Sequence, residues 1–134
     1  MSRSTRLMIA ALLLVAGAIH VQLFFDGYGT NNIGRVFLLQ AIACAGVALY
    51  LVMTDDELAS VFASAVGAVS LGAFALSRIG DGILGFRERG LSPGPQAILA
   101  VLAELVIVVL AAPGVRRSLR TLTRLARPDH RSPA

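Results

Sequence analysis

Glu104 is the residue whose surroundings most suggest a chemical role. It lies in the run QAILAVLAELVIVVLAA, Gln96 to Ala112, which is otherwise apolar after its first residue. A carboxylate inside a membrane-crossing run is costly, so it needs either a partner or a function. The side chains that other apolar runs could bring to it are His20, Gln40, Cys44 and Arg78. We therefore predict a buried polar layer formed by these four residues and Glu104.

Counting along the apolar runs places several of these residues at similar depths. At about 1.5 Å per helical residue, His20 lies about 8 Å, Gln40 about 10 Å and Glu104 about 12 Å from one membrane face. Cys44 follows Gln40 by four residues and shares its helix face. We expect Glu104 to face the bundle interior and to meet His20, directly or through water. Gln40 and Arg78 are the alternative partners.

Several kinds of chemistry are open to such a layer. A buried His–Glu pair is typical of proton relays, and His20, Cys44 and Glu104 are adequate ligands for zinc or copper. The only other histidine is His130 in the tail, so a bis-histidine haem would need two chains. Walker, H-E-x-x-H, C-x-x-C and G-x-S-x-G motifs do not occur. We therefore predict no cofactor and favour a non-catalytic structural or accessory subunit, with proton, ion, metal or haem handling as the alternative.

The composition indicates an integral membrane protein. Of the 134 residues, 56% are hydrophobic and 15% are charged, whereas soluble domains average roughly 45–50% and about 25%. A single cysteine, Cys44, excludes an intrachain disulfide. Enzymatic activity is not predicted, but the composition does not decide it.

Four apolar runs approach the roughly 20 residues that a helix needs to cross a bilayer. Because a spanning segment must satisfy its backbone hydrogen bonds internally, helices are expected. The sequence therefore predicts an all-α four-helix transmembrane domain in residues 1–112, with spans at about 7–25, 33–53, 58–77 and 96–112. The T-x-x-E spacing at 54–57 predicts a capped, tight turn between the second and third spans. Whether Ala16-Gly17-Ala18 is a signal-peptide cleavage site is left open.

The third run is rich in small residues. Two small-xxx-small pairs permit close approach of another helix. They are Ala63 with Gly67, and Ala68 with Gly72. We predict helix-packing contacts at these four positions.

The C-terminal segment carries the excess positive charge. Residues 113–134 contain six Arg and one Asp, a net charge of +5, whereas residues 1–112 contain six Arg and seven acidic residues, giving −1. We expect Pro113-Gly114 to end the fourth helix and a basic amphipathic surface helix to follow over about 115–127. Such a helix binds anionic lipid headgroups rather than nucleic acid. Its headgroup-binding residues would be Arg117, Arg120, Arg124 and Arg127.

The arginines also predict an orientation. With four spans both chain ends share one side, which then holds eight Arg, against four on the other side. The positive-inside rule places both termini in the cytoplasm. Other partners could be a larger membrane complex or further copies of the chain.

The spacing of several residues resembles a group of uncharacterised small bacterial, mostly actinobacterial, four-span membrane proteins. The similarity covers most of residues 10–110, and the residues that carry it are His20, Asp26, Tyr28, Gly34, Phe37-Leu38-Leu39, Ser77-Arg78, Gly82 to Phe86, and Glu104. The resemblance implies the four-span architecture and a location in a bacterial inner membrane. It also draws attention to His20 and Glu104, but it implies no reaction. In that group the loop motif reads G-L-P-G, so Leu84 stands where proline is expected.

Overall fold

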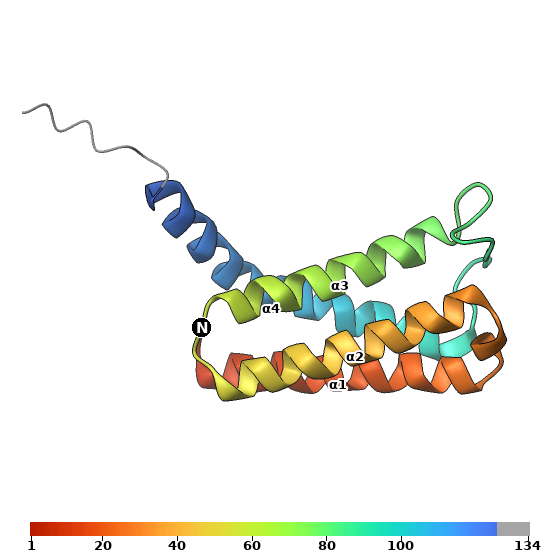
Figure 1. The fold of residues 1–134 in the computed structure, drawn as a ribbon, viewed down its shortest axis with the longest axis horizontal. Coiled ribbons are helices and arrows are strands. Elements are labelled where there is room, and N and C mark those ends of the chain that lie inside the picture. Colours follow the sequence, from red (N-terminus) through yellow and green to blue (C-terminus); the bar gives the residue numbers. More distant parts are fainter. Residues whose placement is uncertain (126–134) are drawn as a thin grey trace, which may run out of the picture.

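Four long helices make up the fold (Figure 1). The computed structural model describes residues 1–125. Its elements are α1 (Arg3–Phe25), the short 3-10 helix η1 (Tyr28–Thr30), α2 (Asn32–Met53), α3 (Leu58–Leu76) and α4 (Gly94–Leu125). All four α-helices are long and apolar enough to cross a membrane. The all-α, four-span prediction is therefore confirmed.

The helices alternate in direction, so the bundle has two distinct ends (Figure 1). The start of α1, the α2–α3 turn at 54–57 and the part of α4 near Gly114 lie together at what we name the closed end. The segment 26–31 and the loop 77–93 lie together at the loop end. α1 packs mainly on α2 and α3 mainly on α4, while contacts between α1 and α4 join the two pairs.

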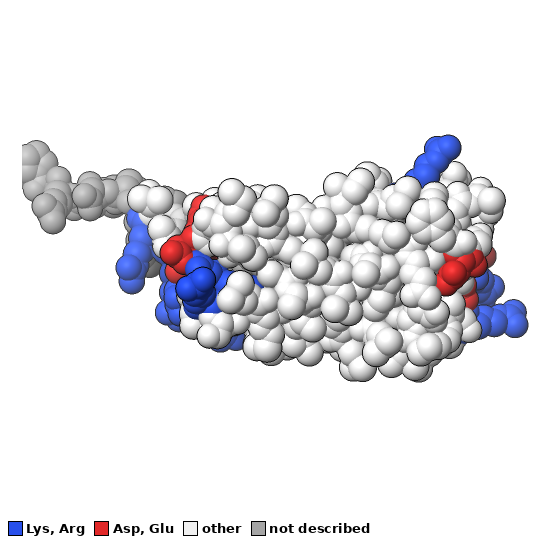
Figure 2. All heavy atoms as spheres, turned by 90° about the horizontal axis from the view of Figure 1, so that it is seen from below, with Lys and Arg blue, Asp and Glu red and all other residues white. Residues whose placement is uncertain are grey.

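The surface between the two ends is apolar. Figure 2 shows charged side chains gathered at the ends and an uncharged face between them. Large apolar side chains are exposed on every helix, for example Leu14 (55%), Ile42 (68%), Val69 (67%) and Val109 (69%). Exposed apolar surface on this scale is rare in soluble monomers. With the four long apolar helices, it indicates a multi-pass membrane protein.

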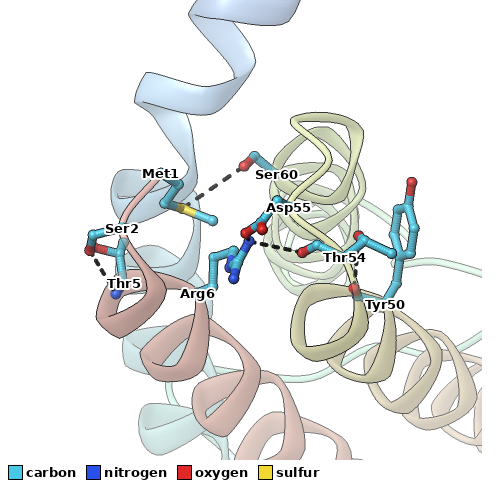
Figure 3. A network of polar contacts seen from close by, with 8 residues as sticks. All are labelled: Met1, Ser2, Thr5, Arg6, Tyr50, Thr54, Asp55 and Ser60. Atoms are coloured by element: carbon cyan, nitrogen blue, oxygen red, sulfur yellow. Dashed lines mark hydrogen bonds and ion pairs between the residues drawn. The ribbon is translucent and has the colours of Figure 1, made fainter.

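Close packing at the closed end makes a dense core. Ile9, Leu13, Leu51 and Ile107 are each fully buried there. The Arg6 guanidinium pairs with the Asp55 carboxylate and donates a hydrogen bond of 3.0 Å to the Thr54 carbonyl (Figure 3). This network fastens the start of α1 to the α2–α3 turn.

The turn between α2 and α3 is tight, as predicted, but its cap is a different residue. The Asp56 carboxylate accepts the backbone N–H of Leu58 at 2.9 Å. The Thr54 hydroxyl instead donates back to the Tyr50 carbonyl at 3.0 Å. Asp56 thus supplies the side-chain acceptor that the T-x-x-E spacing assigned to Thr54.

The expected end of the fourth helix at Pro113-Gly114 is wrong, because α4 continues through Pro113 to Leu125. A Cβ atom at Gly114 would lie 2.3 Å from the Ser60 Oγ and 2.5 Å from its Cβ. The glycine therefore permits α3 and α4 to approach closely rather than ending the helix. The basic segment is an extension of α4 that projects past the bundle (Figure 1). Arg127, and the end of the surface helix predicted for it, lie outside the described residues.

Only one of the two small-residue pairs on α3 forms a helix contact. Ala63 and Gly67 are buried, and a Cβ at Gly67 would lie 3.2 Å from the Glu104 carbonyl oxygen of α4. Ala68 and Gly72 are exposed, and a Cβ at Gly72 would meet nothing within 4 Å. The packing contacts predicted at Ala68 and Gly72 are therefore wrong. The second pair lies five residues after the first, about 140° further around the helix, so α4 can cover only one of them.

Candidate functional site: a polar cavity at the loop end

A cavity of about 100 Å³ lies between the four helices at the loop end. Apolar side chains form most of its wall, and the loop 77–93 lines its outer side. Every helix and the loop also contribute polar side chains. These are His20, Gln40, Ser70, Ser77, Arg78, Glu88 and Glu104.

Glu104 lies on α4 and is buried, with 2% of its surface exposed. Its Oε1 accepts a hydrogen bond of 2.5 Å from the Ser70 hydroxyl of α3. Ser70 was not among the predicted polar residues, although it follows Gly67 by three positions and so shares its α4-facing side. It did not stand out because α3 is rich in Ala, Ser and Gly. The partner of Glu104 is thus a hydroxyl on the neighbouring helix.

His20 lies on α1 and is 7% exposed. Its Nδ1 is 2.8 Å from the Ala16 carbonyl oxygen. Because a carbonyl only accepts hydrogen bonds, Nδ1 must carry the proton, which leaves Nε2 as an acceptor in the neutral ring. Within the described chain no direct hydrogen bond joins His20 to Glu104, but both side chains line the cavity. His20 and Glu104 therefore meet across the cavity and not through a direct contact.

Gln40 connects α2 to α3. Its Nε2 donates to the Val66 carbonyl at 3.2 Å. That carbonyl also fixes the orientation of the amide, since only the nitrogen end can donate. The Gln40 Oε1 is therefore left as an acceptor at the cavity wall. This bond joins α2 to α3, as the Ser70–Glu104 bond joins α3 to α4.

Cys44 does not line the cavity, but it adjoins the predicted polar layer, because the Gln40 Nε2 donates to its Sγ at 4.0 Å. It is buried where α1 crosses α2, and its Cβ lies 3.2 Å from the position that a Cβ on Gly17 would take. Its position four residues after Gln40 gave it the right helix face. One turn further toward the closed end, however, α1 approaches α2 too closely to leave space. Cys44 is thus a packing residue at this crossing.

Arg78 lies at the mouth of the cavity and does not contact Glu104. Its guanidinium donates to the carbonyls of Phe74 (2.9 Å), Gly90 (2.7 Å) and Ser92 (2.5 Å), and it stacks on the Phe74 ring at 3.4 Å. Partial burial lowers the pKa of Arg78, while nearby Glu88 raises it. Arg78 therefore holds the loop 77–93 against the end of α3.

Tyr28 provides a second attachment for the loop. Its hydroxyl donates to the Glu88 Oε1 at 2.7 Å, and its ring makes edge contacts with Phe37 and Phe86. Burial, and then the bond to Glu88, raises the pKa of Tyr28 to about 12. The phenol thus remains a donor over the ordinary pH range and fixes the loop over the cavity.

The turn of this loop takes a conformation that proline cannot adopt. Ile83 and Phe86 pair as a single β-bridge, and Leu84 between them has a φ of 53°. Proline is restricted to a φ near −65°. A proline could therefore not replace Leu84 without changing the backbone of this turn.

Comparison with known proteins gives no further guide to the site: no protein-family model, curated protein or solved structure matches this chain. Among residues 1–125, no group of three or more His, Cys, Asp or Glu side chains is placed to hold a metal ion. The cavity and the groups around it are therefore the features that bear on function.

Proposed function

We propose that this protein is a non-catalytic accessory protein of a bacterial inner membrane. Its loop-end polar layer would fix the helices around a small binding cavity, and either further copies of the chain or a larger membrane complex would be its partner. The observation that carries this proposal is the pair of interhelical hydrogen bonds, Ser70 to Glu104 and Gln40 to the Val66 carbonyl. Both connect neighbouring helices, as expected of groups that hold a bundle in register.

The arrangement of arginines supports an orientation with both ends in the cytoplasm. The closed end carries Arg3 and Arg6 and the basic extension of α4, whereas the loop end carries Arg35, Arg78, Arg87 and Arg89. The positive-inside rule then places the cavity in the outer leaflet. A reporter that is active only outside the cytoplasm should be silent when fused after Leu125 and active when inserted after Gly90. The opposite pattern would overturn the orientation.

The basic extension of α4 would hold anionic lipid headgroups. Arg120 and Arg124 lie on its exposed surface, and the Arg117 guanidinium is within 3.8 Å of the Glu57 carboxylate. Binding of the purified protein to anionic vesicles should fall when Arg120 and Arg124 are changed to Gln, and it should fall in high salt. Equal binding of wild type and variant would remove the electrostatic part of the proposal.

Proton or ion handling is the alternative function, because His20 and Glu104 face one cavity and the His20 Nε2 has no hydrogen-bond partner among residues 1–125. Proton flux into proteoliposomes, followed with a pH-sensitive dye, separates the two. An accessory role predicts no flux above protein-free vesicles, for both wild type and Glu104→Gln. Flux that Glu104→Gln abolishes and the control Glu57→Gln, at the closed end, retains would replace the accessory role with proton handling.

A further inference from the structure

The loop-end cavity contains more free hydrogen-bond acceptors than free donors. The Glu104 carboxylate accepts at both oxygens when ionised, and only its Oε1 has a partner among the described residues, the Ser70 hydroxyl. The Gln40 Nε2 donates to the Val66 carbonyl and to the Cys44 Sγ, and the His20 Nδ1 donates to the Ala16 carbonyl. What these side chains leave toward the cavity are acceptors: the Glu104 Oε2, the Gln40 Oε1 and the His20 Nε2 of the neutral ring.

The charges around the cavity also favour a ligand that donates hydrogen bonds. Arg78 is the cation at the mouth, but its guanidinium is occupied by three loop and helix carbonyls and stacks on Phe74. Glu88 lies close enough to Arg78 for its negative charge to raise the pKa of the guanidinium, against the larger lowering by burial. With these two opposite charges together at the mouth, ionised Glu104 is the uncompensated charge within the cavity. A buried carboxylate without a cation is costly, so a cationic ligand would relieve it.

The rest of the wall limits the ligand to a small one with an apolar part. Phe37 and Phe74 face the cavity with Val36 and Val101. Aromatic faces attract cations as well as hydrocarbon. An apolar cavity of about 150 Å³ accepts benzene, so a cavity of about 100 Å³ holds a chain of only a few carbons.

We propose that the loop-end cavity binds a small primary ammonium group attached to a short hydrocarbon. Three N–H donors on the ammonium match the acceptors of Glu104, Gln40 and His20, and the hydrocarbon lies against Phe37 and Phe74. This assignment rests on the proposed accessory role, in which the cavity binds rather than catalyses. The same ammonium chemistry occurs in free alkylamines and in the headgroup of ethanolamine lipids.

Titration of the purified protein in choline-lipid nanodiscs tests the proposal directly. The probe is n-butylammonium, and n-butanol is its neutral counterpart of the same length. We expect saturable n-butylammonium binding by calorimetry, with n-butanol at least tenfold weaker. Glu104→Gln should weaken n-butylammonium binding at least tenfold, while Glu57→Gln, at the opposite end of the bundle, should leave it unchanged. Equal affinity for the two probes, or binding insensitive to Glu104→Gln, would overturn the proposal.

A second variant keeps the test valid if Glu104→Gln disturbs the fold. Ala100 lines the cavity and is 7% exposed, so Ala100→Leu fills space without changing charge. It should abolish n-butylammonium binding while the helical circular dichroism stays that of wild type. Binding that survives in a folded Ala100→Leu protein would place the ligand elsewhere and overturn the assignment.

Nanodiscs that contain ethanolamine lipid distinguish the two sources of ammonium. Competition by this lipid against n-butylammonium identifies the headgroup as the ligand, and unchanged binding identifies a free amine. The outcomes also separate this proposal from the proposed function. Binding of n-butanol alone overturns the ammonium assignment but keeps a binding cavity, whereas proton flux that depends on Glu104 overturns the accessory role itself.

Discussion

The closed end and the loop end of the bundle are made from the same four helices, but they are filled differently. Leu13, Leu51 and Ile107 meet in a solid apolar core at the closed end, where Gly114 lets α4 approach Ser60 closely. At the loop end a smaller apolar cluster, Ile19 with Leu23 and Ala100, adjoins a cavity lined by buried polar groups. The closed end is therefore filled by side chains, whereas the loop end retains a cavity.

This difference in packing suggests that the closed end contributes stability and the loop end contributes a binding site. Dense packing contributes many small dispersion contacts, which a cavity lacks on its open side. The loop end replaces part of that packing with hydrogen bonds between helices and with a loop fixed by Tyr28 and Arg78. We infer that the closed end supplies most of the stability and that the loop end can keep a cavity because of it.

The largest expected effect comes from matched truncations on α1. Leu13 is fully buried at the closed end, whereas Leu23 is 5% exposed and already borders the cavity. Leu13→Ala should lower the free energy of unfolding by about 2–5 kcal/mol. Leu23→Ala should cost clearly less, because one side of Leu23 has fewer contacts to lose. Unfolding in mixed detergent micelles, followed by circular dichroism, measures both, with lipid-facing Leu14→Ala as the control. Equal losses for Leu13 and Leu23 would remove the contrast between the two ends.

Two glycines provide the next comparison. Gly114→Ala places a methyl group within 2.5 Å of the Ser60 Cβ, which cannot move without its helix. Overpacking of this kind costs about 1–3 kcal/mol. Gly72→Ala meets nothing within 4 Å, so it should be neutral or stabilise by up to about 1 kcal/mol through helix propensity. The same unfolding assay measures both. A larger loss at Gly72 would mean that the exposed face of α3 forms a contact of its own.

The four spans could be predicted from the sequence because each follows from one local property, an apolar run long enough to cross a bilayer. The continuation of α4 could not be predicted in the same way. Pro113-Gly114 has the composition of a helix end, but the glycine at this position serves the contact with Ser60. That use depends on where α3 lies, which no local pattern specifies.

The polar site was only partly predictable for the same reason. The cost of polar groups in lipid suggests that His20 and Glu104 lie inside, and both side chains are buried. Their partners depend on the rotation of each helix. Ser70 reaches Glu104 because the Gly67 side of α3 faces α4, while Cys44 is displaced from the cavity by the crossing of α1 at Gly17. Depth along a helix can be counted from sequence, but the direction a residue faces in the bundle cannot.

Removing the hydrogen bond between α3 and α4 should have a moderate effect. Ser70→Ala takes away the donor to Glu104. Interhelical hydrogen bonds in membranes contribute about 0.6–1.7 kcal/mol, and a loss of that size is expected. Ser64→Ala on the same helix is the control, since the Ser64 hydroxyl has no hydrogen bond within the described chain. If the two variants lose equal stability, the Ser70–Glu104 bond does not hold α3 and α4 in register.

The smallest expected effect concerns the loop over the cavity. Tyr28→Phe removes the hydrogen bond to Glu88, worth about 0.5–1.5 kcal/mol, so hydrogen exchange in residues 77–93 should speed up by roughly two- to tenfold. Tyr50→Phe removes the corresponding bond to Asp56 at the closed end and should leave this loop unchanged.

The pH dependence of this loop gives an independent check on the role of Tyr28. Its pKa is raised from 10.0 to about 12, chiefly by burial and then by the bond to Glu88. The protonated phenol is therefore favoured in the folded state. Its contribution is complete below about pH 10 and is lost as the pH rises through about 12. Loop protection, corrected for the intrinsic exchange rate, should fall across this interval in wild type and in Tyr50→Phe but not in Tyr28→Phe. The same fall in all three proteins would show that Tyr28 does not fix the loop, and the loop end would then depend on Arg78 alone.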